Sequence, residues 1–183
     1  MPYLLSLMVL LLLGGCGTLH VTNDYDPGVD LASRTSYAML HDSECGDPLK
    51  QQRVERALKR EMEKKGYRQA ESSEADFLLV FHVDVRTRTQ IETTYEHLGY
   101  FPYTFYPYYV PMHVPVSRSY TYTEEQLVVD AMLPEEKRVV WRGTATDREH
   151  DFKTPEARIG YVNGVVGKIM QPFPASKTSG VAP

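Results

Sequence analysis

The amino-acid sequence predicts an α+β fold: an antiparallel sheet of about four to five strands with two amphipathic helices packed on one face. Three observations predict it. Apolar and polar residues alternate over 76–86, apolar residues recur at helical spacing in two segments, and the strands do not alternate strictly with the helices. With 183 residues, 42% apolar and 24% charged, the chain suits a single domain over residues 21–174.

Five segments are predicted to be strands: 21–25, 36–40, 76–86, 119–132 and 138–146. The third has the clearest pattern, because Phe77, Leu79 and Phe81 face one way and the residues between them face the other. Its alternation becomes polar from Arg86 to Thr94, which predicts a strand that continues beyond the core and becomes exposed. The last two segments are predicted to complete an antiparallel meander, with Trp141 in the core.

Each predicted helix begins with a capping residue followed by proline. Asp47-Pro48 opens a helix that ends near Lys65, before Gly66, and Thr154-Pro155 opens a second one that ends before residue 172. Proline suits the first helical turn because its missing N–H has no partner there. Residues 175–183 are predicted to be a disordered tail.

The first sixteen residues predict export and lipid attachment. The apolar run 3–13 would form a helix of about 16 Å, too short to span a bilayer and typical of the apolar part of a secretory signal. Gly14-Gly15-Cys16 follows it and resembles the bacterial lipobox, which implies a signal peptide at 1–15, lipid on Cys16 and a tether at 16–20. The alternative, a buried helix of a cytosolic protein, is disfavoured by the glycines and by the lack of a polar face.

The predicted location is the cell envelope, with the protein anchored to a membrane through the lipid on Cys16. Gly17, rather than Asp, at the next position favours the outer membrane on its periplasmic side. The net charge of −4 and the lack of a strongly basic block argue against nucleic acid as a partner. Cys45 has no intrachain partner if Cys16 is acylated, so it is either buried and inert or joined to another molecule.

Three groups of residues are informative through their order and spacing along the chain. They are Asp24-Tyr25-Asp26 with Ser36-Tyr37-Ala38, Ala75 to Val80, and Leu127 to Asp130 followed by Val139 to Ala145. Placed after a lipobox-like cysteine, they resemble the bacterial lipoproteins grouped as domain of unknown function 4136. The resemblance extends over roughly residues 19–174. It implies a cell-envelope lipoprotein with a sheet-and-helix domain, and it implies no established activity or catalytic residue.

An aromatic, proline-rich segment at 95–118 is the most unusual part of the sequence, and its prolines predict an extended loop or a poorly paired hairpin tip in its middle. Tyrosine combines a large apolar face with a polar hydroxyl, which suits binding. The bland alternative is that the segment folds back on its own sheet and covers it. Among binding roles, an envelope protein is favoured as the partner over envelope glycan or the membrane. The candidate binding residues are Tyr100, Phe101, Tyr103, Phe105, Tyr106, Tyr108 and Tyr109.

Two groups of residues are the main candidates for chemistry. One is the loop with His41, Asp42, Glu44, Cys45 and Asp47, and the other is His82 with Asp84 on one strand face; His150-Asp151, in a polar loop, is a weaker candidate. Neither has a recognised metal-ligand spacing or a neighbouring nucleophile, so the sequence favours a non-catalytic binding or scaffold protein without a cofactor other than the covalent lipid. The alternatives are a metal-dependent or hydrolytic envelope enzyme that uses these residues, and a structural lipoprotein that contacts glycan.

Overall fold

The computed structural model describes residues 19–41, 47–102 and 109–177, with the backbone alone for residues 41, 98–102 and 109–112. The chain divides into two compact units. The first, called here the sheet-helix unit, comprises Met1–Asp84 and Glu125–Pro183; the second, called the hairpin unit, comprises Val85–Glu124. Two long strands, β4 (Phe77–Pro102) and β5 (Tyr109–Leu133), contribute to both units.

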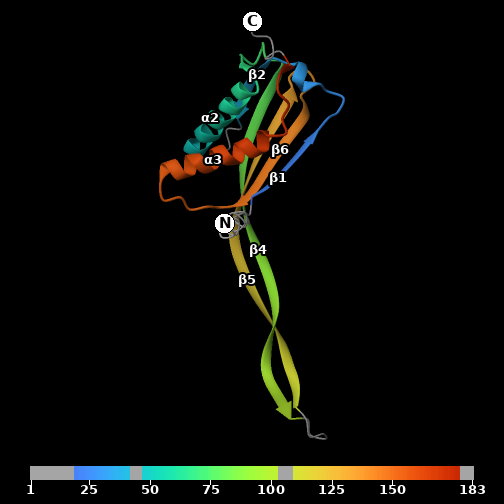
Figure 1. Ribbon diagram of the computed structural model, residues 1–183, viewed down its shortest axis with the longest axis vertical. Helices are drawn as coiled ribbons and strands as arrows, with labels where there is room; N and C mark the ends of the chain where they lie inside the picture. Colours follow the sequence, from blue (N-terminus) through green and yellow to red (C-terminus); the bar gives the residue numbers. More distant parts are fainter. Residues whose placement is uncertain (1–18, 42–46, 103–108, 178–183) are drawn as a thin grey trace, which may run out of the picture. The chain divides into compact units, whose positions relative to one another are not determined.

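Six strands form one sheet in the order β1-β6-β5-β4-β2-β3 (Figure 1). The four strands not yet given bounds are β1 (His20–Tyr25), β2 (Ser36–His41), β3 (Arg68–Gln69) and β6 (Arg138–Arg148). β1 pairs antiparallel with β6, whereas β2 runs parallel to both β3 and β4.

The α+β class is therefore confirmed, but the sheet has one strand more than predicted and is antiparallel only in part. The parallel pairing arises because α2 (Pro48–Lys64) lies between β2 and β4 in the chain and returns it to the same end of the sheet. In the register of that pairing, Tyr37 lies opposite Phe77.

Both predicted helices are present, and they lie side by side over one face of the sheet (Figure 1). The Asp47 carboxylate accepts the backbone N–H groups of Leu49 and Lys50 at the start of α2, and the Thr154 hydroxyl caps α3 (Pro155–Met170) in the same way. After α2, Gly66 has a φ of 83°, the left-handed conformation that glycine adopts most readily. Among the described residues, no helix is both long and apolar enough to cross a membrane.

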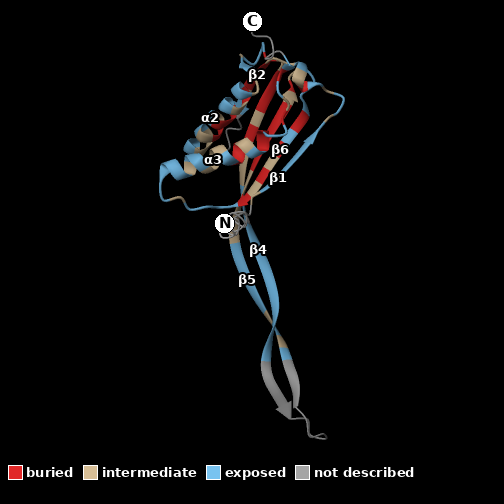
Figure 2. Ribbon diagram, in the orientation of Figure 1, coloured by how far each residue is buried: buried red, intermediate tan, exposed pale blue. Residues whose placement is uncertain are grey.

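The core of the sheet-helix unit lies between the sheet and the helices (Figure 2). Phe173, just after α3, closes it at one end: its ring lies 4.9 Å from that of Trp141 and 5.8 Å from that of Tyr67. Trp141 is 2% exposed, which confirms its predicted place in the core. A second, smaller group of buried residues is formed by Ala38, Ala75 and Leu78.

A carboxylate joins the start of β2 to the start of β4. Asp76 Oδ2 accepts hydrogen bonds from the backbone N–H groups of Thr35 and Ser36, both at 2.9 Å. The hydroxyls of the same two residues donate to it at 3.1 and 2.9 Å. These hydrogen bonds lower the pKa of Asp76 to about 2, because they stabilise its charged form. Asp76 thus holds in place the parallel pairing that the sequence did not predict.

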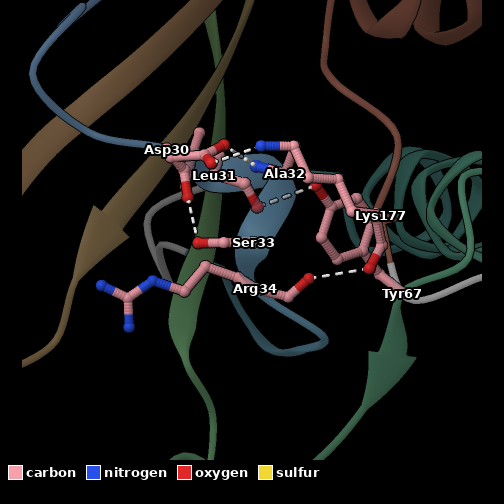
Figure 3. Close-up of polar contacts among 8 residues, drawn as sticks. Asp30, Leu31, Ala32, Ser33, Arg34, Tyr67 and Lys177 are labelled. Atoms are coloured by element: carbon pink, nitrogen blue, oxygen red, sulfur yellow. Dashed lines mark hydrogen bonds and ion pairs between the residues drawn. The ribbon is translucent and has the colours of Figure 1, made fainter.

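The chain after α3 is tied to the corner between β1 and β2 (Figure 3). Lys177 Nζ lies 2.6 Å from Asp30 Oδ2, and the single O–H of Tyr67 is shared between the backbone oxygens of Leu31 and Pro174, at 3.1 and 3.2 Å. Ser176 is 5% exposed and its hydroxyl donates to the backbone oxygen of Arg34. The sequence predicts a disordered tail from residue 175, but Ser176 and Lys177 are part of the folded unit.

Candidate functional site

The hairpin unit is a two-stranded antiparallel ribbon. Three cross-strand contacts set its register: Thr89 Oγ1 with Thr121 Oγ1 at 3.4 Å, Thr93 Oγ1 with Ser117 Oγ at 2.9 Å, and the rings of His97 and His113 with centroids 5.2 Å apart. Each four-residue step along β4 is matched by four residues back along β5, as an antiparallel ladder requires. Residues 85–97 are all exposed, as Figure 2 shows.

The strands continue further than predicted. β4 extends to Pro102 and β5 begins at Tyr109, so most of the segment 95–118 that the sequence predicts to be a loop is strand. Proline lacks a backbone donor, yet a two-stranded ribbon tolerates it because each strand has an edge without a partner.

The seven candidate binding residues, 100–109, belong to the last residues of β4, the first residue of β5 and the segment of the chain between them. The backbone of Tyr100 and Phe101 belongs to β4 and that of Tyr109 to β5, whereas Tyr103, Phe105, Tyr106 and Tyr108 lie outside the described residues. Their role in binding stays a prediction.

Side chains of a strand alternate between its two faces, and in the hairpin unit this gives two faces of different chemistry. One face carries no Asp, Glu, Lys or Arg from Val85 to Tyr95 and from Pro115 to Thr123; it is built mainly of Thr and Ser. Ile91 and Tyr95 on this face are 70% and 72% exposed, so it presents apolar surface to solvent. The other face carries the charged residues Arg86, Arg88, Glu92, Glu96, Arg118 and Glu124.

Ion pairs link the two strands across the charged face. Arg88 Nε lies 3.1 Å from Glu124 Oε2, and Arg118 Nη2 lies 2.6 Å from Glu96 Oε1. Exposed pairs of this kind contribute at most about 1 kcal/mol each, so they select the register more than they stabilise the ribbon. The side chains of Glu96 and Arg118 remain 50% and 58% exposed and can contact a further molecule.

The sheet-helix unit has a cavity of about 170 Å³ near the start of α2. Val54, Leu127 and Val165 contribute apolar side chains to its wall. At its rim, Lys50 Nζ lies 2.6 Å from Glu125 Oε1. The cavity therefore combines an apolar wall with a charged rim, a common character of small-ligand sites.

A polar network lines part of this cavity. The Asp147 carboxylate, whose side chain is 6% exposed, accepts the Tyr161 hydroxyl at 2.7 Å and lies 3.2 Å from His150 Nε2. Burial, together with the adjacent Asp147 carboxylate, raises the pKa of Tyr161. The tyrosine hydroxyl thus stays protonated and donates to the carboxylate. This network was not predicted from the sequence; its one signal there is the alternation that places Asp147 on the same face of β6 as Trp141 and Ala145.

A second cavity, of about 340 Å³, lies between α2 and α3. Its wall includes four cationic residues of α2 and one acidic residue: Arg53, Arg56, Lys59, Arg60 and Glu63. Arg60 donates a hydrogen bond to the side-chain oxygen of Asn163 on α3, which links the two helices.

The residues considered for chemistry do not meet at one place. His82 and Asp84 share one face of β4, where both are partly buried. Residues 42–46 lie outside the described part of the chain, and Asp47 caps α2. Among the residues that the structure describes, no group of three or more His, Cys, Asp or Glu is placed to hold a metal ion.

Comparison with known protein families decides the family. The profile of a family described as domain of unknown function (DUF4136) matches residues 21–175. This chain belongs to the DUF4136 family. The resemblance seen in the sequence is thereby confirmed, and the description of the family names no activity. No curated protein matches the sequence at a significant level.

Two solved structures share the fold of this DUF4136 protein. A PDZ domain protein from Parabacteroides distasonis is 14% identical with a TM-score of 0.51; the match covers 88% of this chain but 36% of that chain, so this protein spans about a third of its length. The PelC dodecamer from Paraburkholderia phytofirmans is 12% identical with a TM-score of 0.51, and the match covers 87% of this chain and 98% of that chain. At these identities the likeness shows the fold alone.

Proposed function

We propose that this DUF4136 protein is a lipid-anchored protein of the cell envelope that acts by binding another protein through its hairpin unit, and that it catalyses no reaction. One observation carries the proposal: the ribbon Val85–Glu124 exposes a face rich in Thr and Ser as well as a charged face. Exposed apolar side chains such as Ile91 and Tyr95 are a feature of binding surfaces.

The anchor in this proposal is a lipid on Cys16, on the periplasmic side of the outer membrane. The apolar run that precedes Cys16 and the family of the chain support it. Two or more acyl chains hold a protein stably at a membrane, whereas one chain gives reversible attachment. We expect Cys16→Ser to abolish labelling with palmitate and to remove the protein from the outer-membrane fraction. Unchanged labelling and fractionation would contradict the proposed anchor.

The proposal assigns a structural role to the polar network of the sheet-helix unit, in which Asp147 of β6 accepts the Tyr161 hydroxyl of α3 and lies beside His150. PelC, which shares the fold, is a dodecamer, and this supports a role in protein assembly.

The proposed function is tested by shortening the hairpin without disturbing its register. Residues 94–116 are removed and Thr93 is joined to Ser117 through Asn-Gly, a dipeptide that forms two-residue hairpin turns. Cross-linking in cells then compares the shortened protein with the wild type and with the control Leu49→Ser, a change at an exposed position of α2. We expect the cross-linked partners to be lost from the shortened protein and kept in the control. An unchanged set of partners in the shortened protein would refute the proposal.

A further inference from the structure

Among the described residues, no third strand pairs with either outer edge of the hairpin unit. β2 pairs with β4 at residues 77–81, all within the sheet-helix unit, so β4 and β5 are each other's neighbours in the described part of the hairpin unit. The outer edge of each strand carries backbone N–H and C=O groups that can pair with a further strand. An isolated two-stranded hairpin is marginally stable in water, which adds to the gain from such pairing.

In the hairpin unit, the basic part of β4 faces an acidic residue of β5, and the acidic part of β4 faces a basic residue of β5. β4 is basic at Arg86 and Arg88 and acidic further along, at Glu92 and Glu96. β5 carries Arg118 opposite the acidic part of β4, and it carries the acidic Glu124 opposite the basic part. A strand that pairs antiparallel with the open edge of β4 therefore needs the charge order that β5 has, and β5 of another copy supplies it.

We propose that the hairpin unit pairs edge to edge with the hairpin unit of a second copy of this chain, β4 of one copy against β5 of the next. The inference rests on the proposed function, because it takes the hairpin unit as the binding surface and specifies the partner. The pairing is considered for two copies that lie side by side with their hairpins in the same direction. In that arrangement β4 of one copy runs antiparallel to β5 of its neighbour, as the two strands do within one chain.

The other side-by-side pairings are disfavoured by charge. Two copies of β4 that run in the same direction would place Arg86 and Arg88 against themselves, and like charges directly opposite each other are destabilising. Two copies of β5 would do the same with Arg118. Pairing of β4 with β5 joins different edges of each copy, so it extends from copy to copy into a ring or a row.

The exposure of one ion pair shows that the same residues can serve both pairings. Glu96 and Arg118 are bonded within the chain but are 50% and 58% exposed. Each carboxylate and guanidinium has further oxygen or N–H groups for a second partner. Glu96 and Arg118, which form an ion pair within one chain, can therefore also form ion pairs with Arg118 and Glu96 of a neighbouring copy.

Two charge reversals test the pairing, with the full-length lipoprotein in its own membrane. Glu96→Arg and Arg118→Glu are made separately, each in two differently tagged versions, and tagged copies are cross-linked and captured through one tag. For the wild type we expect both tags in the captured multimers. For each reversal expressed alone we expect about a fivefold loss of multimers, because an attraction between copies becomes a repulsion.

Co-expression of the two charge-reversed variants distinguishes contacts between copies from effects within one chain. The new positive side chain at position 96 of one copy then meets the new negative side chain at position 118 of the other, so multimers should return and contain both variants in alternation. The repulsion within each chain is not relieved by mixing, so this recovery reports on contacts between copies. The double variant Glu96→Arg with Arg118→Glu restores both kinds of contact, and we expect it to form multimers like the wild type.

Two results would overturn the inference. One is the absence of multimers in the wild type; the other is a mixture that stays dissociated while the double variant forms multimers. If the hairpin unit then cross-links to a different protein, self-pairing is wrong and the proposed function stands. If the hairpin unit cross-links to no protein at all, the proposed function fails with it.

Discussion

Replacement of Asp76 by Asn tests how the sheet is held together where β2 meets β4. The wild-type carboxylate accepts four hydrogen bonds from Thr35 and Ser36, and its pKa is about 2 against an ordinary value of 3.8. That difference corresponds to about 2 kcal/mol of stability at most, and to about 1–2 kcal/mol once the partial exposure of this side chain is allowed for. We expect Asp76→Asn to lower the free energy of unfolding by this amount at pH 7.

The sign of the pH dependence follows from the lowered pKa. Asp76 stabilises the folded protein above pH 4, and this contribution is lost as the pH falls from about 4 to about 2. Urea unfolding of the purified protein, followed by circular dichroism between pH 7 and pH 3, measures it. The difference between wild type and Asp76→Asn should fall to about half near pH 3, while the exposed control Asp151→Asn should not differ from wild type. Equal stability at pH 7, or a difference that does not change with pH, would refute the reasoning.

Three further substitutions are tested by the same unfolding measurement. Tyr37→Phe should leave stability unchanged or raise it by up to about 1 kcal/mol, because its fully buried hydroxyl has no hydrogen-bond partner among the described residues. Tyr161→Phe should lower stability by about 1–3 kcal/mol, because the buried Asp147 carboxylate loses a donor at 2.7 Å; a loss of stability in Tyr37→Phe would contradict the first account, and unchanged stability in Tyr161→Phe would contradict the second. Gly143→Ala should cost about 1–3 kcal/mol, because its Cβ would clash with the Trp141 ring and lie 2.6 Å from Ile169 Cγ2; an undiminished stability would show that both side chains move aside freely.

Local signals in the sequence were sufficient for the helices. Asp47-Pro48, Gly66 and Thr154-Pro155 act within one helical turn of their own position, so the bounds of α2 and α3 follow closely from the sequence. The order of the strands depends on contacts between distant residues. Nothing in the alternation of 36–40 indicates that β2 runs parallel to β4, and β3 has two residues, too few for any periodicity.

The hairpin unit was predicted in part. The polar alternation after Arg86 correctly indicated a strand that leaves the core. The prolines from Pro102 to Pro115 suit no central strand and so predict an extended loop or a poorly paired hairpin tip, whereas the described backbone on both sides continues as strand. The network of Asp147 with Tyr161 was missed because the two residues lie 14 positions apart, on a strand and a helix that meet only in the folded chain. Asp76 belongs to one of the segments that carry the family resemblance. Its hydrogen bonds with Thr35 and Ser36 give that position a structural role.

The central claim, that the protein acts through its hairpin unit, is tested most directly by placing a photo-cross-linking amino acid at single exposed positions in cells. Tyr95 and Tyr120 in the hairpin unit are 72% and 50% exposed, and Leu49 on α2 is 58% exposed and serves as the matched control. We predict protein adducts at Tyr95 and Tyr120 and none at Leu49. Adducts at Leu49 with none at the two tyrosines would contradict the claim.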